Sequence, residues 1–139
     1  ALDFEDMRHF PAGAAVPAGG VVVVALSASA FRAEYDVAPQ FEIVDSDPTV
    51  PDMLDDPAWG DPAALFQLGN AGDEVVVIRW DGLVDVVTYG DGYHSGVVGC
   101  GLLVAPARTL ERRPYWRDTD SCPTDFRDWP FASPGSVAP

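Results

Sequence analysis

The sequence predicts an all-β fold, an antiparallel β-sandwich with one short helix and long loops. About seven short runs rich in β-branched and aromatic residues recur along the chain. Turn residues separate these runs, since 13 glycines and 13 prolines are spread throughout. Many short strands bounded by turns are typical of a sandwich. The length of 139 residues suits one domain, so we expect a single domain over residues 1–139.

The first expected elements are a strand and a short helix. Residues 21–26 form a run of six apolar residues, mostly valine, after a Gly-Gly pair, which predicts a buried strand. Residues 29–35 predict one or two turns of helix. Ser29 is a suitable N-cap. Phe31 and Tyr35 stand four positions apart and therefore share one helix face.

A short strand at residues 41–44 and a long loop at residues 45–63 are expected next. The loop contains four prolines, which interrupt regular structure, and six aspartates. Loops of this length are often functional or mobile. The acidic residues therefore stand where a binding site is expected.

The clearest local signal is a β-hairpin. Residues 73–80 predict a strand, Asp81-Gly82 predicts the tight turn, and residues 83–89 predict the return strand. The return strand alternates in the way that one-sided burial requires. The remaining expected strands are short, at residues 65–70, 96–104, 109–113 and 124–129.

The charge balance excludes two classes of partner. Acidic residues number 22 and basic residues 8, all of them arginine, for a net charge of −14. Nucleic-acid binding depends on clustered basic residues, so we expect no nucleic-acid partner. An anionic membrane surface is disfavoured for the same reason. The longest apolar run is six residues, which predicts no membrane insertion, and no basic segment precedes an apolar one at the start of this sequence, which predicts no signal peptide.

The two cysteines permit one disulfide. Cys100 lies in a small apolar stretch and Cys122 in a polar loop, 22 positions further on. We expect them to be paired. The alternative is one buried and one exposed free thiol. Two cysteines cannot form a four-thiolate zinc site.

Several motifs follow one another in a specific order. The central ones are residues 66–75, Asp81-Gly82 and residues 84–90. The flanking ones are residues 10–13, residues 16–24, Phe31, Tyr35, residues 109–113, residues 118–120, residues 125–126 and residues 133–135. Together they resemble lamin tail domains of the bacterial type, over about residues 8–135.

The resemblance implies an immunoglobulin-like β-sandwich and a non-catalytic module. Such modules are common in secreted or surface-attached bacterial proteins and are often joined to hydrolase domains. The family has no catalytic residues to transfer to this chain. We therefore expect a secreted or cell-surface interaction module that is not an enzyme, with no catalytic residues and no cofactor-binding residues.

The chain departs from the family pattern at its start. Family members usually open with a strand pair that carries a glutamate-rich motif and an asparagine, followed by a Leu-Ser-Gly-Trp-like segment. This sequence begins at Ala1, after the place of that segment, so it is N-terminally incomplete relative to the family. Truncation, proteolytic trimming or completion by another chain would each account for this. A sandwich without its first strands exposes open sheet edges, so we expect self-association or a protein partner at those edges.

One charged residue on a predicted strand requires a partner. Asp85 lies within residues 83–89, where a carboxylate is costly unless it faces solvent or is paired. Arg112 and Arg113 are the candidates for that pairing.

Two acidic clusters are candidates for a calcium site, since carboxylates supply the oxygen ligands that Ca²⁺ prefers. The first consists of Asp45, Asp47, Asp52, Asp55 and Asp56. The second and weaker one consists of Asp118, Asp120 and Asp125. The alternative for residues 118–120 is a turn whose carboxylates cap backbone N–H groups. Neither matches the EF-hand spacing.

Four tryptophans offer a further binding hypothesis, because exposed aromatic rings stack on sugars. Trp80 and Trp129 fall in strand patterns and are expected to pack against the core. Trp59 and Trp116 fall in predicted loops and are the candidate ligand contacts. The leading hypothesis is protein association or anchoring. The alternative is a calcium- or glycan-binding module appended to a secreted enzyme. A hydrolase is the third class, but no Gly-x-Ser-x-Gly motif is present.

Overall fold

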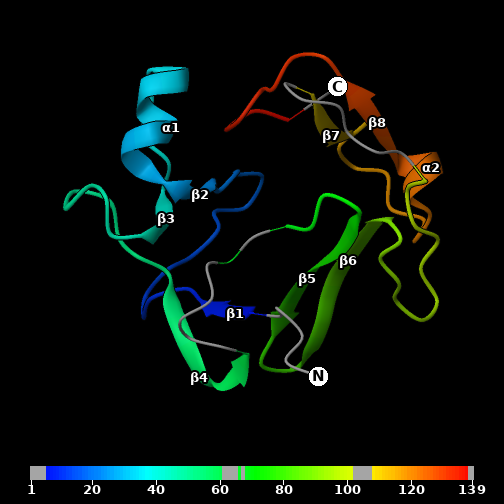
Figure 1. Cartoon of the computed structure of the whole chain (residues 1–139), viewed down its shortest axis with the longest axis horizontal. Helices are drawn as coiled ribbons and strands as arrows, with labels where there is room; N and C mark the ends of the chain where they lie inside the picture. The colour runs from blue at the N-terminus through cyan, green and yellow to red at the C-terminus, as the bar shows by residue number, and fades with distance from the viewer. Residues whose placement is uncertain (1–5, 61–65, 67, 102–107, 138–139) are drawn as a thin grey trace. The chain divides into compact units, whose positions relative to one another are not determined.

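The computed structural model describes residues 6–60, 66, 68–101 and 108–137 (Figure 1). Within these ranges the chain forms eight short strands and two helices, so the fold is broadly all-β as predicted. Contacts divide the chain into two units, residues 1–67 and residues 68–139, and each is described by itself. The expectation of a single domain stays a prediction.

In the first unit, β1 (Asp6–His9) pairs antiparallel with β4 (Leu54–Gly60). The prediction of a loop over residues 45–63 is therefore wrong for the part that forms β4. Pro57 favoured the loop prediction, because proline has no N–H to donate to the hydrogen-bond ladder between strands. Among the described strands β4 has β1 as its only neighbour, and a strand with one open edge tolerates a proline.

The first unit also contains β2 (Val24–Ser27), α1 (Ala28–Tyr35) and β3 (Phe41–Val44). β2 and β3 are parallel, where the sequence analysis expected antiparallel pairing. The parallel pairing is possible because α1 connects the two strands, so that β3 starts at the same end of the pair as β2.

The predicted strand and helix of this region are both shifted at their beginnings. The strand expected from residue 21 begins at Val24, where its ladder with β3 begins. The helix is capped by Ser27 instead of Ser29: the Ser27 hydroxyl accepts a hydrogen bond from the Ala30 N–H at 3.3 Å. Asp36, with a left-handed φ of 57°, ends the helix.

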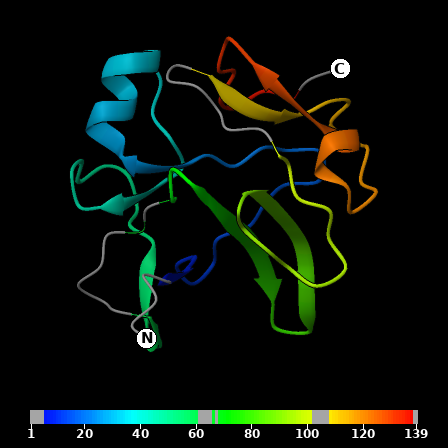
Figure 2. The ribbon, with the colours of Figure 1, turned by 45° about the vertical axis from the view of Figure 1, so that its right-hand side comes forward.

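In the second unit, β5 (Gly72–Arg79) and β6 (Gly82–Gly90) form the predicted hairpin (Figure 2). The turn is shifted by one residue: Arg79 pairs with Gly82, so Trp80 and Asp81 form the loop. Gly82 begins β6 with a φ of 141°, a conformation that favours glycine. The Arg79 guanidinium bonds the Asp81 carboxylate through two nitrogens, at 2.5 and 2.9 Å.

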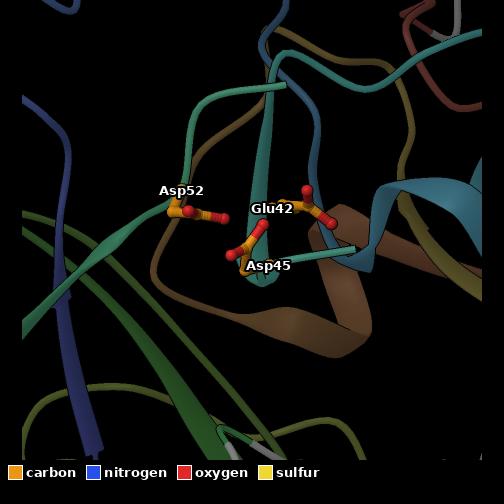
Figure 3. A group of neighbouring side chains, drawn as sticks. All are labelled: Glu42, Asp45 and Asp52. Carbon is orange, nitrogen blue, oxygen red and sulfur yellow. The ribbon is translucent and has the colours of Figure 1, made fainter. Parts of the chain in front are cut away.

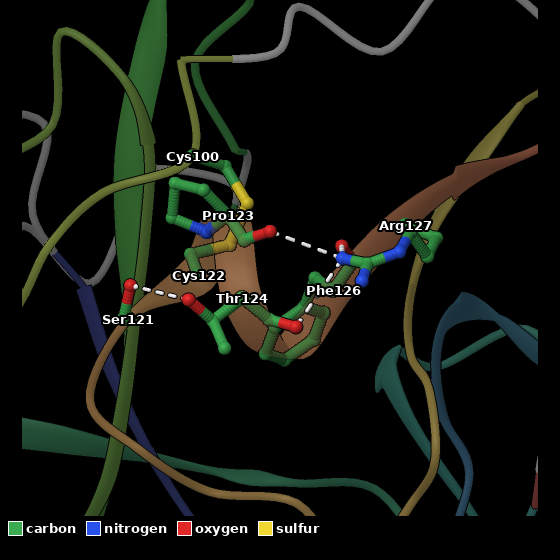
Figure 4. Close-up of a disulfide and its surroundings, with 7 residues drawn as sticks. All are labelled: Cys100, Ser121, Cys122, Pro123, Thr124, Phe126 and Arg127. Atoms are coloured by element: carbon green, nitrogen blue, oxygen red, sulfur yellow. Dashed lines mark hydrogen bonds between the residues drawn. A yellow bond between two sulfur atoms is a disulfide. The ribbon is translucent and has the colours of Figure 1, made fainter.

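A disulfide joins two segments beside β6, between Cys100 and Cys122 (Figure 4). The sequence analysis expected this pairing. The Cys100 N–H donates to the Thr88 carbonyl at 2.9 Å, and the Cys122 N–H donates to the Val98 carbonyl at 2.8 Å. Both cysteines are buried. The bond therefore fastens the segment that lies along β6 to the start of α2 (Cys122–Asp125).

β7 (Thr109–Arg112) and β8 (Phe126–Trp129) form the last antiparallel pair. Two predicted strands are only partly formed. The strand predicted at residues 124–129 begins only at Phe126, because residues 124–125 belong to α2. Of residues 96–104 the described part forms isolated bridges at Val98 and Cys100, and residues 102–104 lie outside the described residues. Of residues 65–70, residues 66 and 68–70 are not in a strand, and the rest lie outside the described residues.

The named sheets are all two-stranded among the described residues. Few side chains are buried within this part of the chain, and the buried apolar ones are small or medium in size: Ala25, Ala28, Val50, Met53, Val86, Cys100 and Cys122. The all-β class is thus observed, while the packing of the pairs into a sandwich stays a prediction.

Reduction of the disulfide is expected to lower the free energy of unfolding of the second unit by about 3 kcal/mol, because the bond closes a loop between cysteines 22 residues apart. Urea denaturation of the oxidised and reduced protein measures this. A double variant, Cys100→Ala with Cys122→Ala, should unfold like the reduced protein and should not respond to reductant. Equal stability of the oxidised and reduced wild type would contradict the structural role of the bond.

Candidate functional site

The candidate site is built around Glu42, whose carboxylate is fully buried. Its Oε2 accepts hydrogen bonds from the Ala28 backbone N–H at 2.8 Å and the Ser46 hydroxyl at 2.5 Å. Its Oε1 accepts from the backbone N–H groups of Ser46, at 3.2 Å, and Asp47, at 2.9 Å. Four donors therefore surround one charge. The Ala28 N–H belongs to the first turn of α1, where negative charge is favoured.

Burial and hydrogen bonding have opposite effects on the pKa of Glu42. Burial raises the pKa of its carboxyl group, but the hydrogen bonds from Ser46, Ala28 and Asp47 lower it more, so the pKa lies below the ordinary value for glutamate. The side chain is therefore ionised in the folded protein at neutral pH. Its hydrogen bonds connect β3 to the start of α1 and to the loop that follows β3 at Ser46 and Asp47.

Two aspartates lie close to Glu42. Each of Glu42, Asp45 and Asp52 offers an oxygen, and these three oxygens lie within 4.8 Å of one another. Figure 3 shows the Asp45 and Asp52 carboxylates turned toward one another, and the Glu42 carboxylate pointing to the other side. Partial burial and the nearby charges of Asp45 and Glu42 raise the pKa of Asp52.

Carboxylate oxygens suit a hard divalent cation, which takes six to eight oxygen ligands when it is Ca²⁺. The Glu42 carboxylate already accepts four hydrogen bonds, which is about its full capacity. A cation would therefore rely on Asp45 and Asp52. Sequence reasoning missed Glu42, although a single acidic residue within the otherwise apolar run of β3 was a usable signal of a buried charge.

The other three aspartates of the first predicted cluster have partners of their own. The Arg32 guanidinium lies 2.7 Å from the Asp47 carboxylate. Asp55 pairs with Arg8, and Asp56 lies 2.8 Å from the His9 ring. The structure thus brings together Asp45 and Asp52 but places the rest of the predicted set in separate ion pairs.

The second predicted cluster is engaged in contacts within its own unit. Asp125 is buried and accepts hydrogen bonds from the Thr119 N–H, at 2.7 Å, and the Thr119 hydroxyl, at 3.0 Å. Burial raises the pKa of Asp125, but these bonds and the charge of Arg112 lower it more. Asp118 lies 2.9 Å from Arg112, and Asp120 is exposed in a left-handed conformation. Asp125 thus accepts the turn's backbone N–H, a role that the sequence did not predict for this residue.

Arg112 is also the partner of Asp85, at 2.6 Å between Nη2 and Oδ2. This confirms one of the two pairings that the sequence left open. Arg113 instead bonds Glu111 and lies over the Trp129 ring, 3.9 Å from its centroid. Arg112 therefore connects β7 to β6 by a partly buried ion pair.

The tryptophans differ from expectation in two cases. Trp59 and Trp116, the candidate ligand contacts, are exposed by 54% and 68%, but Trp59 lies in β4 and not in a loop. Trp80, which was expected to pack against the core, is 93% exposed because it lies in the hairpin loop. The rings of Trp59, Trp80 and Trp116 therefore offer exposed surface for contacts.

A small apolar hollow of about 90 Å³ lies in the first unit. It is lined by Phe10, Ala14, Ala15, Val16, Val22 and Phe41. Pockets for small ligands are usually about 300–1,000 Å³ and contain convergent polar groups. This hollow has neither property.

An exposed apolar surface lies on the β5–β6 hairpin. Val75, Val77 and Ile78 of β5 are exposed by 38%, 47% and 58%. Leu83 and Val84 of β6 are also more than half exposed. Among the described residues β5 pairs with β6 alone, so its outer edge is open. An open edge beside exposed apolar side chains is a surface that favours pairing with another strand.

Comparison with protein-family models, with curated proteins and with solved structures gives no match to this chain. Neither helix in the described part of the chain is long and apolar enough to cross a membrane.

The substitution Glu42→Gln is expected to lower the free energy of unfolding by about 2 kcal/mol at neutral pH, because an amide has only one acceptor oxygen for the four donors. The exposed Glu34→Gln of α1 is the control. Because the folded pKa of Glu42 is lowered, its stabilisation is present above about pH 4.3 and is lost as the pH falls through the folded value. Urea denaturation over a pH series should show the difference between wild type and Glu42→Gln shrinking in acid. A pH-independent difference would contradict this role of the charge.

Proposed function

We propose that the chain is a non-catalytic β-rich module that associates with protein chains through open sheet edges. The observation that carries this proposal is the exposed apolar surface and free outer edge of β5 among the described residues. A two-stranded sheet is marginally stable alone and needs further strands or a packed face. Association with another protein chain would supply those further strands or that packed face.

The other features support a binding role more than a catalytic one. In the first unit, the carboxylates of Glu42, Asp47 and Asp55 are engaged by hydrogen-bond donors and arginines of the same unit. The hollow in the first unit lacks converging titratable groups. Each histidine contacts a carboxylate of its own unit: His9 contacts Asp56, and His94 contacts Glu74.

The same proposal includes the family and location suggested by the sequence. In it the strand pairs pack as an immunoglobulin-like sandwich of the lamin tail type, and the module belongs to a secreted or cell-surface protein where it mediates association or anchoring. The Cys100–Cys122 disulfide supports an oxidising location, since such bonds are rare in reducing compartments.

Light scattering during size-exclusion chromatography tests the proposal. We expect a mass above 14.8 kDa that increases with protein concentration and is the same in calcium and in EDTA. A mass of 14.8 kDa at every concentration would contradict self-association. An assembly that forms only with calcium, or a melting temperature that rises with calcium, would instead favour a cation site at Asp45 and Asp52.

A further inference from the structure

β5 has the features of an edge strand that is ready to accept another strand. Among the described residues its strand ladder is with β6 alone, and the other side of β6 carries the bridge between Tyr89 and Cys100. The one register shift of the hairpin places Val84 as an extra residue on β6, so β5 itself is uninterrupted. β5 contains no proline or lysine, the residues that commonly protect an edge from pairing.

The order of residues along β5 is self-complementary. Asp73 and Glu74 stand near its beginning, four apolar residues follow, and Arg79 stands at its end. When two copies of such a strand run antiparallel, the acidic beginning of each lies beside the basic end of the other. Opposite charges across a strand pair are favourable, and like charges are not.

We propose that β5 pairs antiparallel with β5 of a second copy of this chain, with Val76 at the two-fold axis. This inference rests on the proposed function and names its partner and its edge. Asp73 of each copy then faces Arg79 of the other, Val75 faces Val77, and Val76 faces Val76. The sheet becomes four-stranded in the order β6, β5, β5, β6, which brings it to a size that is stable by itself.

The charges select this register. In a symmetric antiparallel pair, opposed residues share one face of the sheet, so the axis must pass through a residue position. An axis at Val75 would place Asp73 opposite Val77, and an axis at Val77 would place Arg79 opposite Val75. Both alternatives lose the two Asp–Arg pairs. The register centred on Val76 is therefore the one that pairs every residue from 73 to 79 and matches Asp73 with Arg79, while Glu74 faces Ile78.

Arg79 is exposed and Asp73 is partly exposed, so both charged groups can reach this contact; the new ladder takes over the Glu74 N–H, which in the free chain donates to Asp73. The Arg79 side chain is 65% exposed, and its bonds to Asp81 use Nε and Nη2, which leaves Nη1. Asp73 accepts one hydrogen bond on each oxygen, from Gly69 and Glu74, and a carboxylate accepts up to about four. Exposed ion pairs contribute little energy each. The apolar centre therefore supplies the affinity, and the charges set the register.

The first test is dissociation of the wild-type assembly by an edge substitution. Val77→Lys places a charge at the centre of the new pair, while in the free chain the lysine lies opposite Asp85 and is tolerated. We expect the dimer dissociation constant to rise at least tenfold in light scattering. Val98→Lys, in the same unit but outside the hairpin and 57% exposed, is the matched control and should leave it unchanged. Arg79→Glu should also dissociate the dimer, whereas Arg117→Glu, with the same charge change, should not.

The second test reads the register by disulfide trapping under mild oxidation. Val76→Cys should form a covalent dimer, because two copies of position 76 meet at the axis. Val75→Cys should form much less alone but should cross-link to Val77→Cys in a mixture. The native cysteines are joined to one another and do not compete.

The outcomes separate the inference from the proposed function. An assembled wild type that Val77→Lys does not dissociate, and in which Val76→Cys does not cross-link, would overturn pairing at β5 and leave association standing. A wild type that is monomeric at every concentration would overturn β5 self-pairing together with self-association. Dissociation by Val77→Lys and Arg79→Glu, with both controls still dimeric, would support β5 pairing.

Discussion

A two-stranded sheet leaves its edges and faces exposed, and all the named sheets in the described part of the chain are two-stranded. Since each strand pair buries little apolar surface, polar and covalent links position the elements. In the first unit the Glu42 carboxylate holds β3 to the start of α1. In the second unit the Cys100–Cys122 bond and the Arg112–Asp85 ion pair fasten the later segments to the hairpin. The apolar strands are left with surface to offer to a partner.

Buried charges in this protein determine local structure more than they determine chemistry. Glu42 and Asp125 are both removed from solvent, and both are ionised because several donors converge on them. Such groups are costly to bury and costly to leave without a partner, so each specifies the backbone around it. In the acidic loop, Asp47 accepts from the Thr49 N–H and from Arg32, and Asp56 accepts from the Ala58 N–H and contacts the His9 ring.

The elements predicted best from the sequence are those fixed by local chemistry. The Asp-Gly hairpin and the short helix depend on neighbouring residues, and both appear with shifts of one or two positions. β4 was missed because its strand conformation comes from pairing with β1, about 45 residues earlier, and overrides Pro57. Of the candidate site, Asp45 and Asp52 were predicted. Glu42 was not, because its role depends on donors from Ala28 that no spacing rule connects to it.

Hydrogen exchange of the β5 amides at low and high protein concentration tests the central claim most directly, namely that the uncovered strand edge is where this chain associates. The account predicts that β5 amides exchange more slowly as the concentration rises, because their outward N–H groups become paired, while the β7–β8 amides are unaffected. Exchange of β5 that is independent of concentration, in a protein that nevertheless assembles, would contradict it.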